Sequence, residues 1–405
     1  MAMTSPRASV SFHAPRLLDR GLAIGGDPDR WRALEDGLEA FCGALRRAPV
    51  DDSDEDAATR AYIDRLAAAG LLRLVVPEAF GGAAPEVSST ALCITRQWLA
   101  RESGALDSAF VLQGLGSYPV TSAGGDALKA ALLPRVAEGA VICAFALTEP
   151  EAGSDVQALQ TTAHPEPGGD VVLEGEKRFI TNAGVADSYV VFAREGVAAD
   201  STAPERKSYG AFWVPGDAPG LSVRRSKVMA PHPIGAVHLD GVRVPAAHRL
   251  GAPGDGLRIA LGTLDVFRVS VGAAALGLAD RALAETVAHL RERVQFGKPL
   301  AAQQGLQFAL ADVATEHVAA QLLVYRAAAA RDRGIATPDQ AAMAKMYATE
   351  SAQRTIDRAV QSLGGLGVTV GSVPERLYRE IRALRIYEGT TEIQKLVIAR
   401  ALLRG

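Results

Sequence analysis

Apolar and polar positions follow one spacing at both ends of this chain and another in its middle. Residues 27–140 and 253–405 carry Ala- and Leu-rich stretches at helical spacing, such as "AATRAYIDRLAAAG" and "VPERLYREIRAL". Residues 141–252 instead hold short β-rich runs, such as "DVVLEGEKRFI" and "AVHLDGVRVP", separated by Gly, Pro, Asn and Asp. The pattern predicts an α+β protein with three domains: a helical domain, an antiparallel β-sandwich or barrel, and a second helical domain.

Local signals mark several helix ends. Ser53 is placed to cap a helix that Gly70 would end. Residues 337–340, Thr-Pro-Asp-Gln, form a capping box with proline in the first turn, and Gly334 would close the preceding helix. The strands lack intervening helices, and no GxGxxG motif opens a βαβ unit. These two features argue against a doubly wound dinucleotide-binding fold.

Composition and charge exclude several classes of protein. The 405 residues are 48% apolar with a net charge of −3, which gives no electrostatic reason to expect nucleic acid or a membrane surface as a partner. Cys42, Cys93 and Cys143 lie far apart without metal-ligand spacing, which fits a reducing compartment such as the bacterial cytoplasm. No apolar run approaches the roughly 18–20 residues that span a bilayer. We therefore expect neither a metal site nor membrane insertion.

Residues 1–26 have a composition of their own. They contain Arg7, Arg16 and Arg20, several Ser, and no acid before Asp19. This composition loosely resembles an organelle transit peptide, which would place the protein in the mitochondrial matrix. A disordered N-terminal arm is the simpler prediction.

Two loops of the middle zone carry groups suited to a planar, phosphorylated ligand. "AFALTEPEAGSD", residues 144–155, presents hydroxyls and bare backbone N–H groups, although a capped turn would use the same residues. "GEKRFITNAGVADSYVV", residues 175–191, places Phe179 beside Thr181, which would offer a flat ring an aromatic wall and a hydroxyl. A plain hairpin connection is the alternative there.

Three segments of the last zone hold further candidates. In "RERVQFGKPL", Arg293 is suited to a phosphate, or equally to the dipole at a helix C-terminus. In "AVQSLGGLG", Gln361 precedes a glycine pair that permits close approach or ends a helix. "RIYEGTTEIQ" sets the carboxylate of Glu388 between Tyr387 and a Gly-Thr-Thr run.

Six motifs in order resemble the signatures of the acyl-CoA dehydrogenase family of flavoenzymes, from about residue 30 to the end. They are "PEAFGG", "TEPEAGSD", "GEKRFITNAGVAD", "RVQFGKPL", "QSLGGLG" and "ERLYREIRALRIYEGTTEIQ". The resemblance implies an N-terminal helical domain, a middle β-domain and a C-terminal four-helix bundle. It also implies bound FAD, a homotetramer built as a dimer of dimers, and an electron-transfer flavoprotein as electron acceptor.

The resemblance assigns the flavin-facing roles to the middle zone. Leu147 and Thr148 match positions that line the flavin, and Ser154 matches a position near the cofactor phosphates or the thioester arm. Phe179 would cover the ring, and Thr181 would hydrogen-bond near its reactive nitrogen.

The last zone receives the remaining roles that the resemblance implies. Contacts to the FAD of a neighbouring subunit fall on Arg293, Phe296, Gln304, Gln361 and Gly365. Contacts to the pyrophosphate and adenosine part fall on Thr390 and Glu392, and contacts to the substrate and its CoA portion on Asp265, Arg268, Tyr387 and Gly389.

Glu388 resembles the base that removes the α-proton of an acyl thioester while the β-hydrogen leaves as hydride to the flavin. A free glutamate titrates near about 4.3, so we expect desolvation to raise its pKa toward working pH. Some relatives place the base on the helix that here contains "LDVFRVS", but the matching residue is Phe267, which cannot accept a proton.

Two segments leave the substrate open. Residues 231–233, Pro-His-Pro, stand where relatives carry small polar residues, and they form either a rigid turn or a departure near the thioester arm. Asp107 and Gln113 would favour a polar acyl group if they line the pocket, and would otherwise face solvent. The alternatives are an acyl-carrier-protein substrate, a flavin oxidase or monooxygenase, and a non-catalytic flavin-binding partner.

Overall fold

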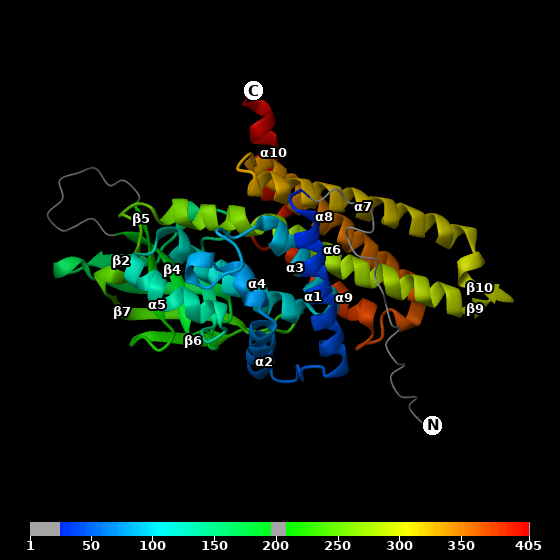
Figure 1. The fold of residues 1–405 in the computed structure, drawn as a ribbon, viewed down its shortest axis with the longest axis horizontal. Helices are drawn as coiled ribbons and strands as arrows, with labels where there is room; N and C mark the ends of the chain where they lie inside the picture. Colours follow the sequence, from blue (N-terminus) through cyan, green and yellow to red (C-terminus); the bar gives the residue numbers. More distant parts are fainter. Residues whose placement is uncertain (1–24, 196–207, 405) are drawn as a thin grey trace.

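A computed structural model describes residues 25–195 and 208–404, so the arm expected over residues 1–26 lies almost wholly outside the described residues. The chain begins with a group of helices and two short 3-10 turns (Figure 1). They are α1 (Pro28–Arg47), α2 (Glu55–Ala68), η1 (Leu71–Val75), η2 (Glu78–Phe80), α3 (Ser89–Glu102), α4 (Gly104–Ala123) and α5 (Asp126–Ala137).

The start of α2 differs from the sequence prediction by one residue. Asp54, not Ser53, is the N-cap, and its side chain accepts hydrogen bonds from the backbone N–H groups of Asp56 and Ala57. A charged acceptor is favoured at this position because it also meets the positive end of the helix dipole. Gly70 lies in left-handed backbone directly after the helix, as expected.

The middle of the chain forms an eight-stranded sheet with strand order β6-β7-β3-β2-β4-β5-β8, and β1 pairs with β4. The strands are β1 (Cys143–Ala146), β2 (Thr162–Pro165), β3 (Val171–Thr181), β4 (Ser188–Glu195), β5 (Tyr209–Pro215), β6 (Leu221–Arg225), β7 (Ile234–Val244) and β8 (Arg249–Leu250). The expected β region is therefore confirmed. It is not wholly antiparallel, because β1 and β2 both run parallel to β4.

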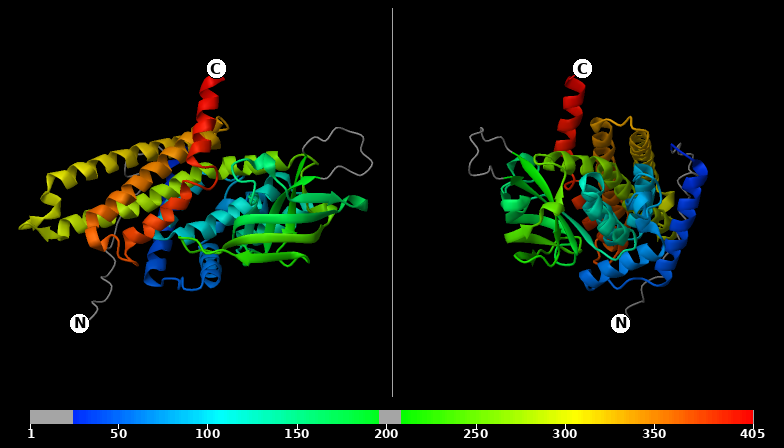
Figure 2. Two further views of the ribbon diagram at one scale, coloured as in Figure 1. Left: turned by 180° about the vertical axis from the view of Figure 1, so that it is seen from behind. Right: turned by 60° about the vertical axis from the view of Figure 1, so that its left-hand side comes forward.

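The rest of the chain is helical, apart from one small hairpin. It contains α6 (Gly256–Glu292), β9 (Val294–Gln295), β10 (Lys298–Pro299), α7 (Gln304–Asp332), α8 (Pro338–Leu363), α9 (Val373–Leu384) and α10 (Thr391–Leu403). Pro338 opens α8 as predicted, but the Thr337 side chain makes no capping hydrogen bond. The sheet and the β9–β10 hairpin lie at opposite ends of the long axis, and α10 projects from the body (Figures 1 and 2).

Helix α6 joins these two ends through the centre of the molecule. Its 37 residues make it about 55 Å long at the usual rise per residue. It starts directly on β5, where a Cβ at Gly256 would lie 2.6 Å from the carbonyl oxygen of Gly210, so only glycine fits. By length and composition α6 could cross a membrane, contrary to the sequence expectation. However, 72% of its apolar window is buried inside the fold, as in the core helix of a globular protein.

Candidate active site

The segment between α9 and α10 has an unusual backbone. Glu388 and Gly389 are consecutive residues in left-handed backbone, with φ angles of 53° and 92°. Left-handed backbone costs roughly 1–2 kcal/mol for a residue with a side chain. Thr390 then caps α10, accepting a hydrogen bond from the N–H of Ile393 at 3.3 Å. Because its backbone is left-handed, the Glu388 side chain leaves the chain in a direction that a residue within α9 or α10 does not take.

Three side chains hold this turn by its carbonyl oxygens. Arg268 Nε on α6 donates to the Glu388 carbonyl at 3.2 Å, and Lys345 Nζ on α8 donates to the Gly389 carbonyl at 2.7 Å. Gln394 Nε2 on α10 donates to both carbonyls, at 3.3 and 3.0 Å. A strained backbone persists where its surroundings fix it in this way.

The carboxylate of Glu388 remains unsatisfied. Its Oε2 atom is buried and has no hydrogen-bond partner among the described residues. Its pKa is raised, chiefly because burial disfavours the charged form, while Arg96, Arg268 and Lys345 act in the opposite direction. A buried carboxylate with a raised pKa and a free oxygen is suited to accept a proton from a bound ligand.

The predicted substrate contacts of the last zone gather around this carboxylate. Arg268 pairs with Asp265 at 2.9 Å, and Asp265 keeps half of its side chain exposed. Tyr387 precedes Glu388 and is 37% exposed. Glu350 on α8 accepts hydrogen bonds from Thr391 Oγ1 at 2.6 Å and from Arg385 Nε at 2.8 Å. These bonds fix the two ends of the turn to α8, while Asp265 and Tyr387 remain partly exposed.

A backbone hydrogen bond connects the two segments of the middle zone that contain the predicted flavin contacts. The N–H of Arg178 donates to the carbonyl of Thr148 at 2.8 Å, which ties Leu147 and Thr148 to Phe179. Phe179 has left-handed backbone with φ of 56°, and its ring is 54% exposed. Thr181, two residues later, ends β3. The half-exposed Phe179, over whose ring the Arg178 guanidinium lies at 5.1 Å from the centroid, is therefore next to Thr148 and Thr181.

A buried ion pair fixes this loop and was not predicted from the sequence. Lys177 Nζ donates to Glu149 Oε1 at 2.7 Å and to the carbonyl of Leu147 at 3.2 Å, and both charged side chains are buried. Glu149 also accepts the N–H groups of Gln160 and Thr161. Burial lowers the pKa of Lys177 to about 8. The spacing of Glu149 and Lys177 gives no local signal, because they meet only through the fold.

Other predicted positions in the middle zone are more exposed or structural. Ser154 is exposed on the loop that follows Glu149. Residues 231–233 end the connection between β6 and β7, and the Pro233 carbonyl there accepts the N–H of Asn182 at 2.7 Å. Burial lowers the pKa of His232, and its Nδ1 lies 2.8 Å from the carbonyl oxygen of Ala230. The segment is thus a turn held between strands.

Asp107 and Gln113 do not face solvent, contrary to one of the sequence interpretations. Asp107 is buried and receives two hydrogen bonds from the buried Arg96, at 2.8 and 2.7 Å. Gln113 is buried as well, donating to the Val141 carbonyl and accepting from the Cys143 N–H. Gln113 is therefore a structural residue that ties α4 to β1.

The remaining predicted cofactor contacts lie at the other end of α6. Arg293, Phe296, Gln304, Gln361 and Gly365 are all exposed, and the Phe296 side chain is 93% exposed. Phe296 lies in the β9–β10 hairpin, Arg293 just before it, Gln304 at the start of α7, Gln361 near the end of α8 and Gly365 just after α8. The hairpin and the sheet that contains Phe179 and Thr181 lie at opposite ends of the molecule (Figure 1). One chain does not bring the two groups together. Thr390 and Glu392, in contrast, flank the start of α10 beside Glu388.

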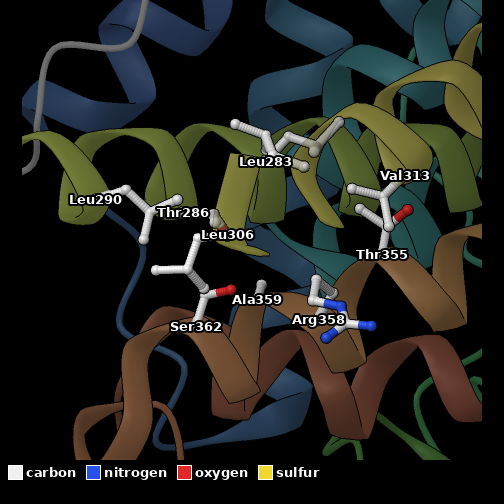
Figure 3. Close-up of a pocket in the computed structure, with 10 residues that line it drawn as sticks. Leu283, Thr286, Leu290, Leu306, Val313, Thr355, Arg358, Ala359 and Ser362 are labelled. Carbon is white, nitrogen blue, oxygen red and sulfur yellow. The ribbon is translucent and has the colours of Figure 1, made fainter. Parts of the chain in front are cut away.

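Two cavities lie apart from these residues. One of about 10 Å³ between α6, α7 and α8 is bordered by Leu283, Val313 and Ser362 (Figure 3) and has room for at most one water molecule. The other, about 800 Å³, is an open depression beside α2 and α5 that includes Arg73 and Phe80. Neither contains a predicted site residue.

Models of three consecutive protein domains match the chain. They are the N-terminal, middle and C-terminal domains of acyl-CoA dehydrogenase, which match residues 29–140, 144–242 and 254–403. An acyl-CoA dehydrogenase of Bacillus subtilis is 40% identical over 85% of this chain and 89% of its own length. A cyclohexane-1-carbonyl-CoA dehydrogenase of Geobacter metallireducens is 38% identical over 83% and 87%.

Solved structures show the same fold. Butyryl-CoA dehydrogenase of Megasphaera elsdenii superposes with a TM-score of 0.84 at 32% identity, covering 92% of this chain and 98% of its own. A chain in a structure described as the electron transferring flavoprotein of Acidaminococcus fermentans gives 0.83 at 32% identity, with coverages of 94% and 100%. A glutaryl-CoA dehydrogenase of Mycobacterium smegmatis in complex with FADH2 gives 0.81 at 26%, with coverages of 94% and 97%.

The fold and the site therefore define an oxidoreductase of the flavoenzyme type. The chain belongs to the acyl-CoA dehydrogenase family.

Proposed function

We propose that this protein is an FAD-dependent dehydrogenase of an acyl-CoA thioester, in which Glu388 removes the α-proton. The observation that carries the proposal is the buried, unpartnered Oε2 of Glu388 on a strained turn held by Arg268, Lys345 and Gln394. A group in left-handed backbone with an unsatisfied buried charge is costly for stability. Function is the reason that such an arrangement is retained.

The residues of the β region fit a flavin. Phe179 presents an exposed ring, and within residues 25–195 and 208–404 the hydroxyls of Thr148, Ser154 and Thr181 have no hydrogen-bond partner. Free hydroxyls beside an aromatic face match the polar edge, flat ring and phosphates of FAD. Bound FAD would supply the acceptor for the β-hydride.

The chain itself would supply proton transfer and orientation. Glu388 accepts the α-proton as the C–H electron pair forms the new double bond and the β-hydrogen leaves as hydride. Among the described residues, the backbone N–H of Glu388 also has no acceptor, so it is available to the thioester carbonyl oxygen. A hydrogen bond there stabilises the negative charge that develops on that oxygen. Arg268 and Asp265 would border the thioester arm.

The test is an anaerobic reduction of the FAD-loaded protein by a panel of straight, branched and cyclic saturated acyl-CoAs. We expect the flavin absorbance to bleach in the wild type and the rate to fall at least about 10²-fold in Glu388→Gln, since the amide cannot accept the proton. The control is Glu316→Gln, which removes an exposed partner of Arg354 and should leave the rate unchanged.

The same experiment also tests the base, the carrier of the acyl group and the electron acceptor. Bleaching that persists in Glu388→Gln would refute Glu388 as the base. A flavin that is bleached only by an acyl carrier protein thioester would assign the carrier-bound substrate. Reoxidation of the bleached enzyme by added electron-transfer flavoprotein, and not by oxygen, would support that acceptor over oxidase or monooxygenase activity.

A further inference from the structure

A second charged pair lies beside the proposed base and takes no part in the roles given above. Arg96 on α3 is 1% exposed and Asp107 in the first turn of α4 is 4% exposed. Nε and Nη2 of Arg96 donate to the two carboxylate oxygens of Asp107, and Nη1 donates to Ser270 Oγ at 2.9 Å. All three guanidinium nitrogens are therefore engaged.

Arg96 is electrostatically coupled to the site. Burial raises the pKa of Glu388, and Arg96 is among the cations that oppose this rise; Tyr387 and Glu388 in turn favour the charged form of Arg96. Ser270, which accepts the third hydrogen bond of Arg96, lies two residues after Arg268, whose Nε holds the Glu388 carbonyl. The pair on α3 and α4 is thus joined through α6 to the turn that holds Glu388.

Every cation around Glu388 is bound to a group other than its carboxylate. Arg268 pairs with Asp265, and Lys345 donates to the Gly389 carbonyl. Among the described residues, Glu350 on α8 and Glu392 on α10 favour the charged form of Lys345, and Arg385 pairs with Glu350. Without Asp107, Arg96 would be a buried cation with no carboxylate partner. A guanidinium keeps its charge when buried, so Arg96 would then be drawn to the Glu388 carboxylate.

We propose that Asp107 is a positioning residue that holds Arg96 away from the Glu388 carboxylate and so keeps the base free to accept a proton. A bidentate Arg–carboxylate pair is favoured by geometry and charge. If Arg96 paired with Glu388 instead, the same geometry would occupy both oxygens of the base. The role of Glu388 as base rests on the proposed function, but its proton affinity is measurable without turnover.

The test is an infrared titration of the FAD-loaded protein in the absence of substrate. The carboxyl band of protonated Glu388 is identified by its loss in Glu388→Gln. In Asp107→Asn we expect its midpoint to fall by at least about one pH unit, because an unpaired cation favours the ionised carboxylate. In the pH profile of flavin reduction, the midpoint of the rise on the acidic side should shift to lower pH by the same amount. The rate at high pH should fall, because a weaker base accepts the proton less readily.

Two variants separate this role from general destabilisation. Arg96→Gln/Asp107→Asn removes both charges, so the midpoint should return to the wild-type value or above it. Asp280→Asn removes another buried carboxylate, which accepts from Gln97 at 2.7 Å and lies 3.0 Å from His317 Nε2. It should lower stability and leave the Glu388 midpoint unchanged.

A midpoint that does not move in Asp107→Asn, or that stays low in the double variant, would overturn the proposal. If Asp107→Asn does not fold, the double variant decides, because it leaves no buried charge unpaired. A double-variant midpoint below that of the wild type would then refute the coupling. Failure of acyl-CoAs to bleach the flavin would refute the proposed function and leave the infrared result standing.

Discussion

At the scale of single residues, the site depends on a turn that the sequence alone does not favour. Glu388 occupies left-handed backbone although only glycine adopts it without strain. Gly389 follows at φ of 92°, and a Cβ there would lie 2.4 Å from Gln394 Nε2. That amide donates to the carbonyls of both turn residues, so the turn and its clamp depend on each other.

We expect Gly389→Ala to misplace the base. The new methyl group would displace the Gln394 amide and would itself occupy strained backbone, so Glu388 would shift from its position. The rate of flavin bleaching should fall about tenfold to hundredfold, because small misplacements of a catalytic group are costly. Stopped-flow reduction by a saturating acyl-CoA measures this rate.

The matched control is Gly37→Ala. Gly37 lies on the exposed face of α1, where a Cβ meets nothing within 4 Å, and alanine favours the helix. This variant should keep the wild-type rate. An unchanged rate in Gly389→Ala would show that the turn tolerates the substitution and that its strain does not serve the reaction.

At the scale of elements, the Lys177–Glu149 pair ties the loop after β1, which contains the predicted flavin contacts Leu147 and Thr148, to β3. We expect Lys177→Met to lower the stability of the protein by about 3–5 kcal/mol, because it leaves a buried carboxylate without its cation. It should also weaken FAD binding, since Lys177 holds the carbonyl of Leu147. Thermal unfolding and fluorescence titration with FAD measure the two effects.

The double variant Lys177→Met/Glu149→Gln provides the control. It removes the unpaired charge, so stability should recover more than FAD affinity does. In the wild type the pKa of Glu149 is lowered, against the effect of its burial, by Lys177 and by backbone hydrogen bonds. The contribution of ionised Glu149 to the stability of the fold is therefore complete above its ordinary pKa of 4.5. This contribution is lost as the pH falls through the lower pKa of Glu149 in the folded protein. Equal FAD affinity in Lys177→Met and the wild type would contradict this role for the pair.

The elements also show how far sequence reasoning reached. The β3 and β7 strands were predicted because alternation and flanking turn residues are local signals. The parallel pairing of β1 with β4 was missed, because it joins residues about 45 positions apart that no local pattern relates. Asp107 was read as either a pocket or a solvent residue, because a buried aspartate differs from an exposed one only through its partner, Arg96. The order of the motifs was enough to predict the site residues. The ion pairs that support them, Lys177–Glu149 and Arg96–Asp107, can be recognised only in the folded structure.

At the scale of the whole molecule, the predicted cofactor contacts lie in separate parts: the β region, the start of α10 and the region around the β9–β10 hairpin. Phe296, in the turn of the β9–β10 hairpin, is 93% exposed and has left-handed backbone. This hairpin lies at the opposite end of the molecule from the sheet that contains Phe179 (Figure 1). An exposed aromatic side chain on a strained turn is costly for an isolated chain. We propose that the hairpin completes the cofactor site of a neighbouring subunit, in the tetramer that the sequence leads us to expect.

The exposed face of α7 provides a test of this assembly. Phe308, Val318 and Leu322 are 61%, 52% and 54% exposed, and they fall within an arc of about 80° at 100° per residue. We expect Leu322→Glu to dissociate the assembly, because a charge would be buried without a partner in an apolar interface. Ala33→Glu adds the same charge to the exposed face of α1 and should leave the assembly intact. Sedimentation of the FAD-loaded protein measures the mass, and FAD release on dissociation would link the hairpin to the cofactor. A wild-type monomer that retains FAD would refute the shared site, whereas a Leu322→Glu tetramer would refute only the role of α7.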